Sequence, residues 1–277
     1  MIKGVNQWCF PEGTSLETVF SVSQAAGLKA VELNVNPDGG VGLTRLTTAE
    51  QAKDIVDQAA GYGLQLRSLS TILLWDYPLS SQDEAIRQEG IAVVRKQVEL
   101  AEAMGIDTVL VVPGVVNEDT TYQQCYDTSS RSIRELVPYA ASKGVCLAIE
   151  NVWNKFLYSP IEMAAFIDQF QSPFVQSYFD VGNVLAVGYP DQWIQVLGHR
   201  IRRVHVKDYN PQVGTLDGFV PLLSGKVNWK KVREALKDIG YTDTVTAELT
   251  PYDHNPLQLI HDTSQHLERI LFESVYD

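Results

Sequence analysis

Short apolar runs of β-forming residues alternate with amphipathic helical segments along the whole chain, and this alternation constrains the fold more than any other feature. Strands this short and apolar are typical of a parallel sheet covered on both faces. Several helical segments end on a glycine just before the next run, as helix C-termini commonly do. The pattern predicts eight strands, at Ile2–Trp8, Ala30–Val35, Leu64–Thr71, Thr108–Pro113, Cys146–Asn151, Val175–Val181, Arg203–Lys207 and Thr244–Leu249.

The number and spacing of these units favour a closed barrel. Eight strands, each followed by a helix, divide the 277 residues into units of roughly 35, which suits a barrel of about 250 residues. An open doubly wound sheet is the main alternative, but no G-x-G-x-x-G motif follows the first strand. No linker, charge block or low-complexity segment divides the chain. We therefore expect an α/β fold in which residues 1–277 form a single (β/α)8 TIM barrel domain with no dinucleotide cofactor.

The charge balance and the cysteines limit the classes of partner. Acidic residues outnumber basic ones by 34 to 22, and the net charge of −12 argues against nucleic-acid binding, which depends on Lys and Arg. No stretch approaches the ~18 apolar residues of a membrane span, and the N-terminus has no signal core. Three cysteines without zinc-ligand spacing suit a reduced setting, so we expect a cytoplasmic protein. A homo-oligomer is compatible with the acidic surface, although no interface signature is visible.

Three acidic side chains and one histidine stand at the ends of the last four expected strands. They are Glu150 in AIEN, Asp180 in FDVGN, His205 in RVHVKD and Glu248 in TAEL. Taken singly, each acid could be a helix cap or a rim ion pair, and the histidine could belong to the core. Such groups are costly to bury unless paired or metal-bound, and the ends of neighbouring barrel strands converge. Their joint placement therefore predicts one shared site.

Three carboxylates and one imidazole form an oxygen-rich ligand set for a divalent metal ion. This set favours Mn²⁺, with Mg²⁺ or Co²⁺ as alternatives, and suits Zn²⁺ less well, since structural zinc prefers thiolates. With four protein ligands, an octahedral ion keeps about two positions for substrate oxygens or water.

Other residues near the expected strand ends are candidates for a substrate pocket. Trp8, Trp75 and Trp153 could wall a sugar site, although aromatic residues at strand ends often belong to the core. Glu32 could bind a sugar hydroxyl, orient a ligand or form a rim ion pair. Lys207 could meet a substrate oxygen or a phosphate.

Further candidates are less specific. Asp208 could support a metal ligand from behind. Arg67 is a weak phosphate candidate, because strand alternation can turn it away from the barrel interior. The segments 37–42 and 210–226 both follow strands, so both are expected on the carboxyl-terminal rim, where either could close over a substrate or serve as a passive connection.

The motifs IEN, FDVGN, HVKD and AEL, in this order at strand ends, resemble the xylose-isomerase-like barrel superfamily of sugar-phosphate isomerases and epimerases. Within it, the chain is most similar to the ketose and ketose-5-phosphate 3-epimerases. The similarity spans nearly the whole chain and includes LSTILLWDYPLSS after the third strand and VLVVPG at the fourth. The resemblance implies a small-molecule sugar or sugar phosphate as substrate and one metal ion bound by Glu150, Asp180, His205 and Glu248. It also implies that Glu150 and Glu248 are the catalytic acid/base pair.

The chain departs from one feature of this family. Epimerases of free ketoses often carry a substrate-binding histidine soon after the sixth-strand aspartate, where this chain has Gly182 and Asn183. We expect Asn183 at the substrate, and the departure favours the phosphate-using or isomerase branches slightly.

The resemblance implies 3-epimerisation through an enediolate, in which one glutamate removes a carbon-bound proton and the other returns one on the opposite face. An aldose–ketose isomerase of the hexulose-phosphate or hydroxypyruvate type could use the same parts, and so could an inosose dehydratase-like lyase. A non-catalytic sugar-binding barrel would not need paired bases. An abasic-site endonuclease of similar fold would need more than the five histidines present and a basic groove.

Overall fold

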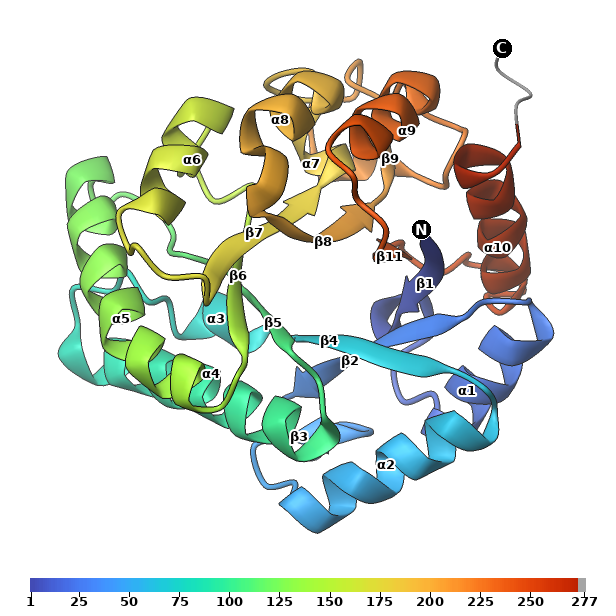
Figure 1. Cartoon of the computed structure of the whole chain (residues 1–277), viewed down its shortest axis with the longest axis horizontal. Helices are drawn as coiled ribbons and strands as arrows, with labels where there is room; N and C mark the ends of the chain where they lie inside the picture. The colour runs from blue at the N-terminus through green and yellow to red at the C-terminus, as the bar shows by residue number, and fades with distance from the viewer. Residues whose placement is uncertain (274–277) are drawn as a thin grey trace.

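The computed structural model describes residues 1–273 and arranges eight parallel strands in a closed ring (Figure 1). The ring runs β1-β2-β4-β5-β6-β7-β8-β11, and pairing of β11 with β1 closes it. Closure leaves no free sheet edge, so the predicted barrel is confirmed and the open sheet is excluded. The strands are β1 Ile2–Asn6, β2 Ala30–Asn36, β4 Gln65–Ser70, β5 Thr108–Val111, β6 Cys146–Glu150, β7 Val175–Asp180, β8 Ile201–Val206 and β11 Thr244–Ala247.

Helices surround the barrel and bury their apolar faces against the strands (Figure 1). Thr48 and Thr121 begin two of the helices with reciprocal capping boxes. Gly27, Gly63 and Gly105 follow helix ends with positive φ, as the sequence predicted. The main helices are α1 Leu16–Ala25, α2 Ala49–Gly61, α4 Glu84–Met104, α5 Tyr122–Ser142, α6 Pro160–Asp168, α8 Pro190–Leu197, α9 Trp229–Asp238 and α10 Gln258–Leu271.

Seven of the eight strands end one or two residues earlier than the sequence predicted, and at two of them a polar side chain turns the chain. The side chain of Asn6 accepts a hydrogen bond from the Trp8 N–H and starts the 3₁₀ turn η1, Gln7–Cys9, so β1 stops before Trp8. In the same way, Asp180 accepts a hydrogen bond from the Asn183 N–H and caps the short helix α7, Val181–Val184. The chain therefore bends at the carboxyl-terminal mouth of the barrel.

The two predicted rim segments form different structures. The segment 37–42 joins β2 to β3, Leu43–Thr44, which extends the sheet beside β2. The segment 210–226 contains η3, Leu216–Gly218, and β10, Phe219–Val220; β10 pairs antiparallel with β9, Asp208–Tyr209.

Asp208 fixes the base of the second segment. Its carboxylate accepts hydrogen bonds from the Val227 N–H and from Trp229 Nε1, both at 3.0 Å. A Cβ at Gly225 would lie 2.1 Å from Asp208 Oδ1, so only glycine allows this close approach. Asp208 therefore anchors the loop and does not support a metal ligand.

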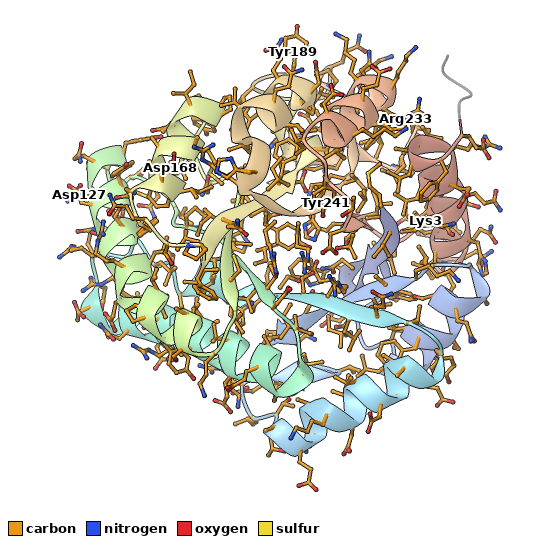
Figure 2. The ribbon with its side chains drawn as sticks, in the orientation of Figure 1. Lys3, Asp127, Asp168, Tyr189, Arg233 and Tyr241 are labelled. Carbon is orange, nitrogen blue, oxygen red and sulfur yellow. The ribbon has the colours of Figure 1, made fainter. Side chains whose placement is uncertain are left out.

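An ion-pair network lies at the amino-terminal end of the barrel. Arg203 is only 1% exposed and donates to Asp107 at 2.6 Å and to Asp243 at 3.0 Å. Arg67, the weak phosphate candidate, also donates to Asp243, at 2.8 Å, and so lies at the opposite end from the predicted site. In Figure 2, Tyr241 of this end lies inside the ring of helices, whereas Tyr189 points outward.

All three cysteines are buried with free thiols. Among residues 1–273, no helix combines the length and apolar character needed to cross a membrane.

Candidate metal centre

The four predicted ligands meet at the carboxyl-terminal mouth of the barrel. Glu150 ends β6, Asp180 ends β7, His205 lies on β8 and Glu248 follows β11 directly. Asp180 and His205 are paired in register on adjacent strands. One ligand atom from each of the four residues lies within 4.8 Å of the others. The strand order thus produces the convergence that the sequence predicted.

The state of Asp180 indicates that the cluster suits a cation. Its side chain is fully buried, and Oδ1 accepts the Asn183 N–H at 2.7 Å. Oδ2 is also buried and has no hydrogen bond, although Lys207 Nζ lies 3.0 Å away as an ion-pair partner. A buried carboxylate oxygen without a hydrogen bond is costly, and coordination of a cation removes that cost. Three carboxylates and an imidazole are therefore a fitting donor set for a divalent metal ion.

Glu32 orients the histidine of the cluster. His205 Nδ1 lies 3.1 Å from Glu150 Oε1, while Nε2 lies 2.5 Å from Glu32 Oε2 on the other side of the ring. Glu32 also accepts hydrogen bonds from the Tyr178 hydroxyl at 2.7 Å and from Asn6 Nδ2 at 2.6 Å. A carboxylate at Nε2 leaves Nδ1 to face the ligand cluster. Of the three roles left open for Glu32, its position matches the orienting one.

Electrostatics reinforces this pairing. Burial disfavours both the Glu32 carboxylate and the protonated His205 ring, but the attraction and hydrogen bonding between these two groups outweigh the effect of burial. The pKa of Glu32 therefore lies below its ordinary value, and the pKa of His205 lies well above its own, with Glu150 and Glu248 contributing to the rise. A cation bound at Nδ1 would replace the proton there and leave the Nε2 proton for Glu32.

The two glutamates at the mouth have different proton affinities. Burial raises the pKa of Glu150 to about 7, and the charges of Glu248 and Asp180 add to the rise against the opposing effect of His205. Burial acts in the same direction on Glu248, but the charges of Lys207 and His205 outweigh it, so the pKa of Glu248 lies below its ordinary value. Neighbouring carboxyl groups with separated pKa values are typical of acid/base pairs.

Lys207 lies among the carboxylates as their positive neighbour. Its ammonium group hydrogen-bonds to Glu248 and lies 5.2 Å from the centre of the Phe219 ring. A Cβ at Gly182 would lie 2.5 Å from both Lys207 Cγ and the Lys207 carbonyl oxygen. The glycine of the DVGN motif is therefore required for the close approach of this lysine.

A cavity of about 730 Å³ opens over the cluster. The sequence-predicted residues that line it are Trp8, Trp75, Trp153, Asn183 and Lys207, together with Glu150 and Glu248. Glu32 does not line it, since that side chain is buried behind His205. The segment 210–226 contributes part of the wall, whereas none of the described residues of 37–42 does. A second cavity, of about 270 Å³, shares Val152, Trp153 and Asn183 with the first.

The sequence analysis did not identify two residues that support the centre, Tyr178 and Asn6. Tyr178 lies two residues before Asp180 on the same strand, and strand alternation places both on the interior side. The tyrosine was therefore detectable. Asn6 carried no comparable signal, because its role depends on the approach of Glu32 from the neighbouring strand.

Comparison with known proteins agrees with this fold. The L-ribulose-5-phosphate 3-epimerase UlaE of Salmonella typhimurium (strain LT2) is 28% identical over 256 residues, which cover 89% of this chain and 86% of the relative. The structure of a D-psicose 3-epimerase in the presence of D-fructose has a TM-score of 0.80 at 16% identity, covering 98% of this chain and 99% of its own. The structure of an L-ribulose 3-epimerase has a TM-score of 0.81 at 17% identity, covering 98% and 94%.

A family model described as xylose isomerase-like TIM barrel matches residues 20–270. This match spans most of the sequence and agrees with the closed barrel and its cluster of carboxylates. The chain belongs to the xylose isomerase-like TIM barrel family.

Proposed function

We propose that this protein is a divalent-metal-dependent 3-epimerase of a ketose or ketose phosphate. The observation that carries the proposal is the convergence of Glu150, Asp180, His205 and Glu248, with both glutamates also lining a large cavity. The names of the relatives, which include 3-epimerases of a ketose phosphate and of free ketoses, support the same reaction class.

The ligand set supports Mn²⁺ as the ion, with Mg²⁺ and Co²⁺ as substitutes. Glu150, Asp180 and Glu248 would hold it through oxygen, and His205 through Nδ1. When bound, the ion supplies Lewis-acid stabilisation of the negative charge that develops on the substrate oxygens. Glu32 keeps His205 in the orientation that this binding needs.

The glutamates supply the proton transfers. Epimerisation beside a carbonyl removes a proton from carbon and returns one on the opposite face. Glu150 and Glu248 come from β6 and β11, the two outer strands of the four that carry the ligands, so they can approach a substrate carbon from different sides. Toward one epimer, one glutamate takes the proton from carbon and the other returns one to the opposite face. In the reverse direction the two exchange roles.

The remaining cavity residues position the substrate. Trp8, Trp75 and Trp153 offer flat apolar surfaces to the face of a sugar and exclude water from the reacting carbons. Lys207 faces the cavity with its ammonium group and can donate to a substrate oxygen.

Proton NMR in D₂O tests the proposal. The metal-stripped enzyme is incubated with ketoses and ketose phosphates, with and without Mn²⁺. We expect deuterium to enter at C3 only when the ion is present, and the 3-epimer to accumulate. Exchange at C1 or C2 with aldose formation would identify an isomerase, and loss of water would identify a lyase. No metal-dependent exchange with any sugar would refute the proposal.

A further inference from the structure

We propose that the site takes an uncharged ketose, whose end distal to the carbonyl packs against apolar side chains, and that it discriminates against a terminal phosphate. The inference rests on the proposed function and names its substrate class. It concerns the part of the cavity that lies away from the metal ligands.

The two halves of the barrel contribute different chemistry to the cavity. The metal ligands come from β6, β7, β8 and β11, which are consecutive in the ring, so β1, β2, β4 and β5 form the opposite half. From that half, the lining consists almost entirely of apolar side chains. The residues are Trp8, Thr71, Ile72, Trp75, Leu110 and Val112.

Apart from the indole N–H groups of Trp8 and Trp75, the polar group of this wall is the Thr71 hydroxyl, which is already hydrogen-bonded. Thr71 Oγ1 donates to the Val35 carbonyl at 2.7 Å and accepts the Leu73 N–H at 3.2 Å. Ile72 and Trp75 keep 44% and 39% of their surfaces exposed, so apolar area faces the open mouth without being covered by protein. Exposed apolar surface within a cavity is typical of a site that binds an apolar part of a ligand.

The loop over the mouth continues the same wall. Segment 210–226 contributes Leu216, Phe219, Val220 and Pro221, and the chain after β11 adds Leu249 and Pro251. Leu216 is 66% exposed, and the loop that carries it is held in place by Asp208. The distal end of a substrate would therefore meet apolar atoms from the wall and from the loop.

The described lining of the cavity has no cation free to bind a phosphate away from the metal ligands. It includes two carboxylates, Glu150 and Glu248, and a single cation, Lys207, which is engaged by Asp180 and Glu248. Phosphate recognition uses Arg, Lys or several aimed N–H donors, and a buried charge without them carries a large desolvation cost. Lys155, another cation of this region, lines the second cavity beyond Trp153.

Substrates that differ at one carbon test the inference. The Mn²⁺ enzyme is assayed by C3 deuterium exchange on L-ribulose and its 5-phosphate, and on D-fructose, its 6-phosphate and its 6-deoxy form. We expect kcat/KM for each active free ketose to exceed that for its phosphate by at least about 100-fold, since burial of the unpaired dianion costs several kcal/mol. The 6-deoxy sugar should be turned over at least as well as the free hexose.

Variants at two positions test which part of the cavity sets the preference for a free ketose over its phosphate. In Ile72→Lys, a cation enters the apolar wall, and the ratio of phosphate to free-sugar kcat/KM should rise at least about tenfold over that of the size-matched Ile72→Met. Lys155→Met should leave the ratio unchanged. A selective loss of phosphate turnover in Lys155→Met would place a phosphate site in the second cavity and overturn the inference.

The outcomes separate the inference from the function on which it rests. Preference of the wild-type enzyme for a phosphate, with exchange still at C3, overturns the inference and keeps the 3-epimerase. Metal-dependent exchange confined to free sugars supports both. The absence of exchange with all five sugars overturns both.

Discussion

The two ends of the barrel both contain buried charges, but they balance them differently. At the amino-terminal end, both acids of the network are bonded to arginines; the members are Arg67, Arg202, Arg203, Asp107 and Asp243. At the carboxyl-terminal end, acids exceed cations, and one carboxylate oxygen has no hydrogen bond; the members are Glu32, Glu150, Asp180, Glu248, His205 and Lys207. Both ends belong to the same closed ring of strands (Figure 1).

This difference between the two ends helps to tell a structural ion-pair network from a metal site. A charge that is matched by its neighbours contributes to the folded state and requires no ligand. A cluster in which buried acids outnumber the neighbouring cations fits the binding of a metal cation. An excess of buried acid, and not burial alone, therefore distinguishes the candidate metal centre from the ion-pair network.

The largest expected effect is the loss of turnover at the mouth. Glu150→Gln and Glu248→Gln should each lower the epimerisation rate by at least about 1,000-fold, because each removes one proton-transfer group. In a two-base reaction, each variant should still exchange deuterium with one of the two epimers, and the retained epimer should differ between them. Exchange and epimerisation rates at saturating Mn²⁺ measure this.

Two controls are needed for the Glu150→Gln and Glu248→Gln variants. Mn²⁺ content must be measured in both variants, since each glutamate is also a proposed ligand. Glu99→Gln, which alters a half-exposed glutamate on α4, should keep full activity. Full epimerase activity in either Glu150→Gln or Glu248→Gln would show that the acid/base assignment is wrong.

The second largest effect concerns the ion-pair network at the amino-terminal end of the barrel and should appear in the free energy of unfolding. Arg203→Met should lower the free energy of unfolding by about 3 kcal/mol, because the buried guanidinium joins Asp107, Asp243 and two backbone carbonyls. Mn²⁺ affinity of the folded variant should stay unchanged. Urea denaturation and calorimetric titration measure the two quantities.

Arg202→Met is the matched control for Arg203→Met. Arg202 binds the same Asp107 but keeps 34% of its side chain exposed, so its loss should cost less than about 1 kcal/mol. Equal losses in the two variants would mean that burial does not set the strength of this network.

The third effect, intermediate in size, concerns Mn²⁺ affinity at the carboxyl-terminal mouth of the barrel. Glu32→Gln keeps a hydrogen-bonding group beside His205 but removes the charge that orients and polarises the ring. Mn²⁺ affinity should fall by about 10- to 100-fold, and excess Mn²⁺ should restore activity. Tyr178→Phe, which removes one hydrogen bond to Glu32, should have a smaller effect in the same direction. A loss of kcat that excess Mn²⁺ does not restore would instead place Glu32 at the substrate.

The sequence was sufficient to predict the barrel and the convergence of the four candidate ligands, because both depend on order along the chain. Strand order makes the ends of β6, β7, β8 and β11 neighbours, and each ligand stands at such an end. The role of Glu32 could not be decided in this way. Its partner His205 lies 173 residues away on the opposite part of the ring, and only the interior packing brings them together.

The errors have a similar cause. Arg67 was weighed for phosphate because residue type alone does not tell which end of a strand faces the substrate, and Asp243 holds it at the other end. Asp208 was considered behind a metal ligand because of its closeness in sequence to His205, but the chain bends after β8 and turns its carboxylate to the loop. Apolar character of the distal wall was also not evident, since its members come from separate strands and one loop.

The smallest expected effect is the pH dependence of the amino-terminal network. Burial raises the pKa of Asp243, but the hydrogen bond from Arg67 and the charge of Arg203 outweigh it, so the pKa lies below its ordinary value in the folded protein. The folded state thus binds this proton less tightly than the unfolded chain, whose aspartates titrate near about pH 4. The stabilisation is fully present above that pH and is lost as the pH falls through the folded pKa.

Comparison of wild type with Asp243→Asn isolates this contribution. The difference in unfolding free energy, measured in urea, should be constant from pH 7 to about pH 5 and should shrink below about pH 4, as the wild-type carboxylate is protonated. The effect is modest because 24% of the Asp243 side chain is exposed and two arginines share it. In an Arg67→Met background the shrinkage should be smaller, since one of the groups that lower the pKa is gone. A difference that grows toward low pH would mean that the carboxylate destabilises the network, and the two ends of the barrel would then differ less than their ion pairs indicate.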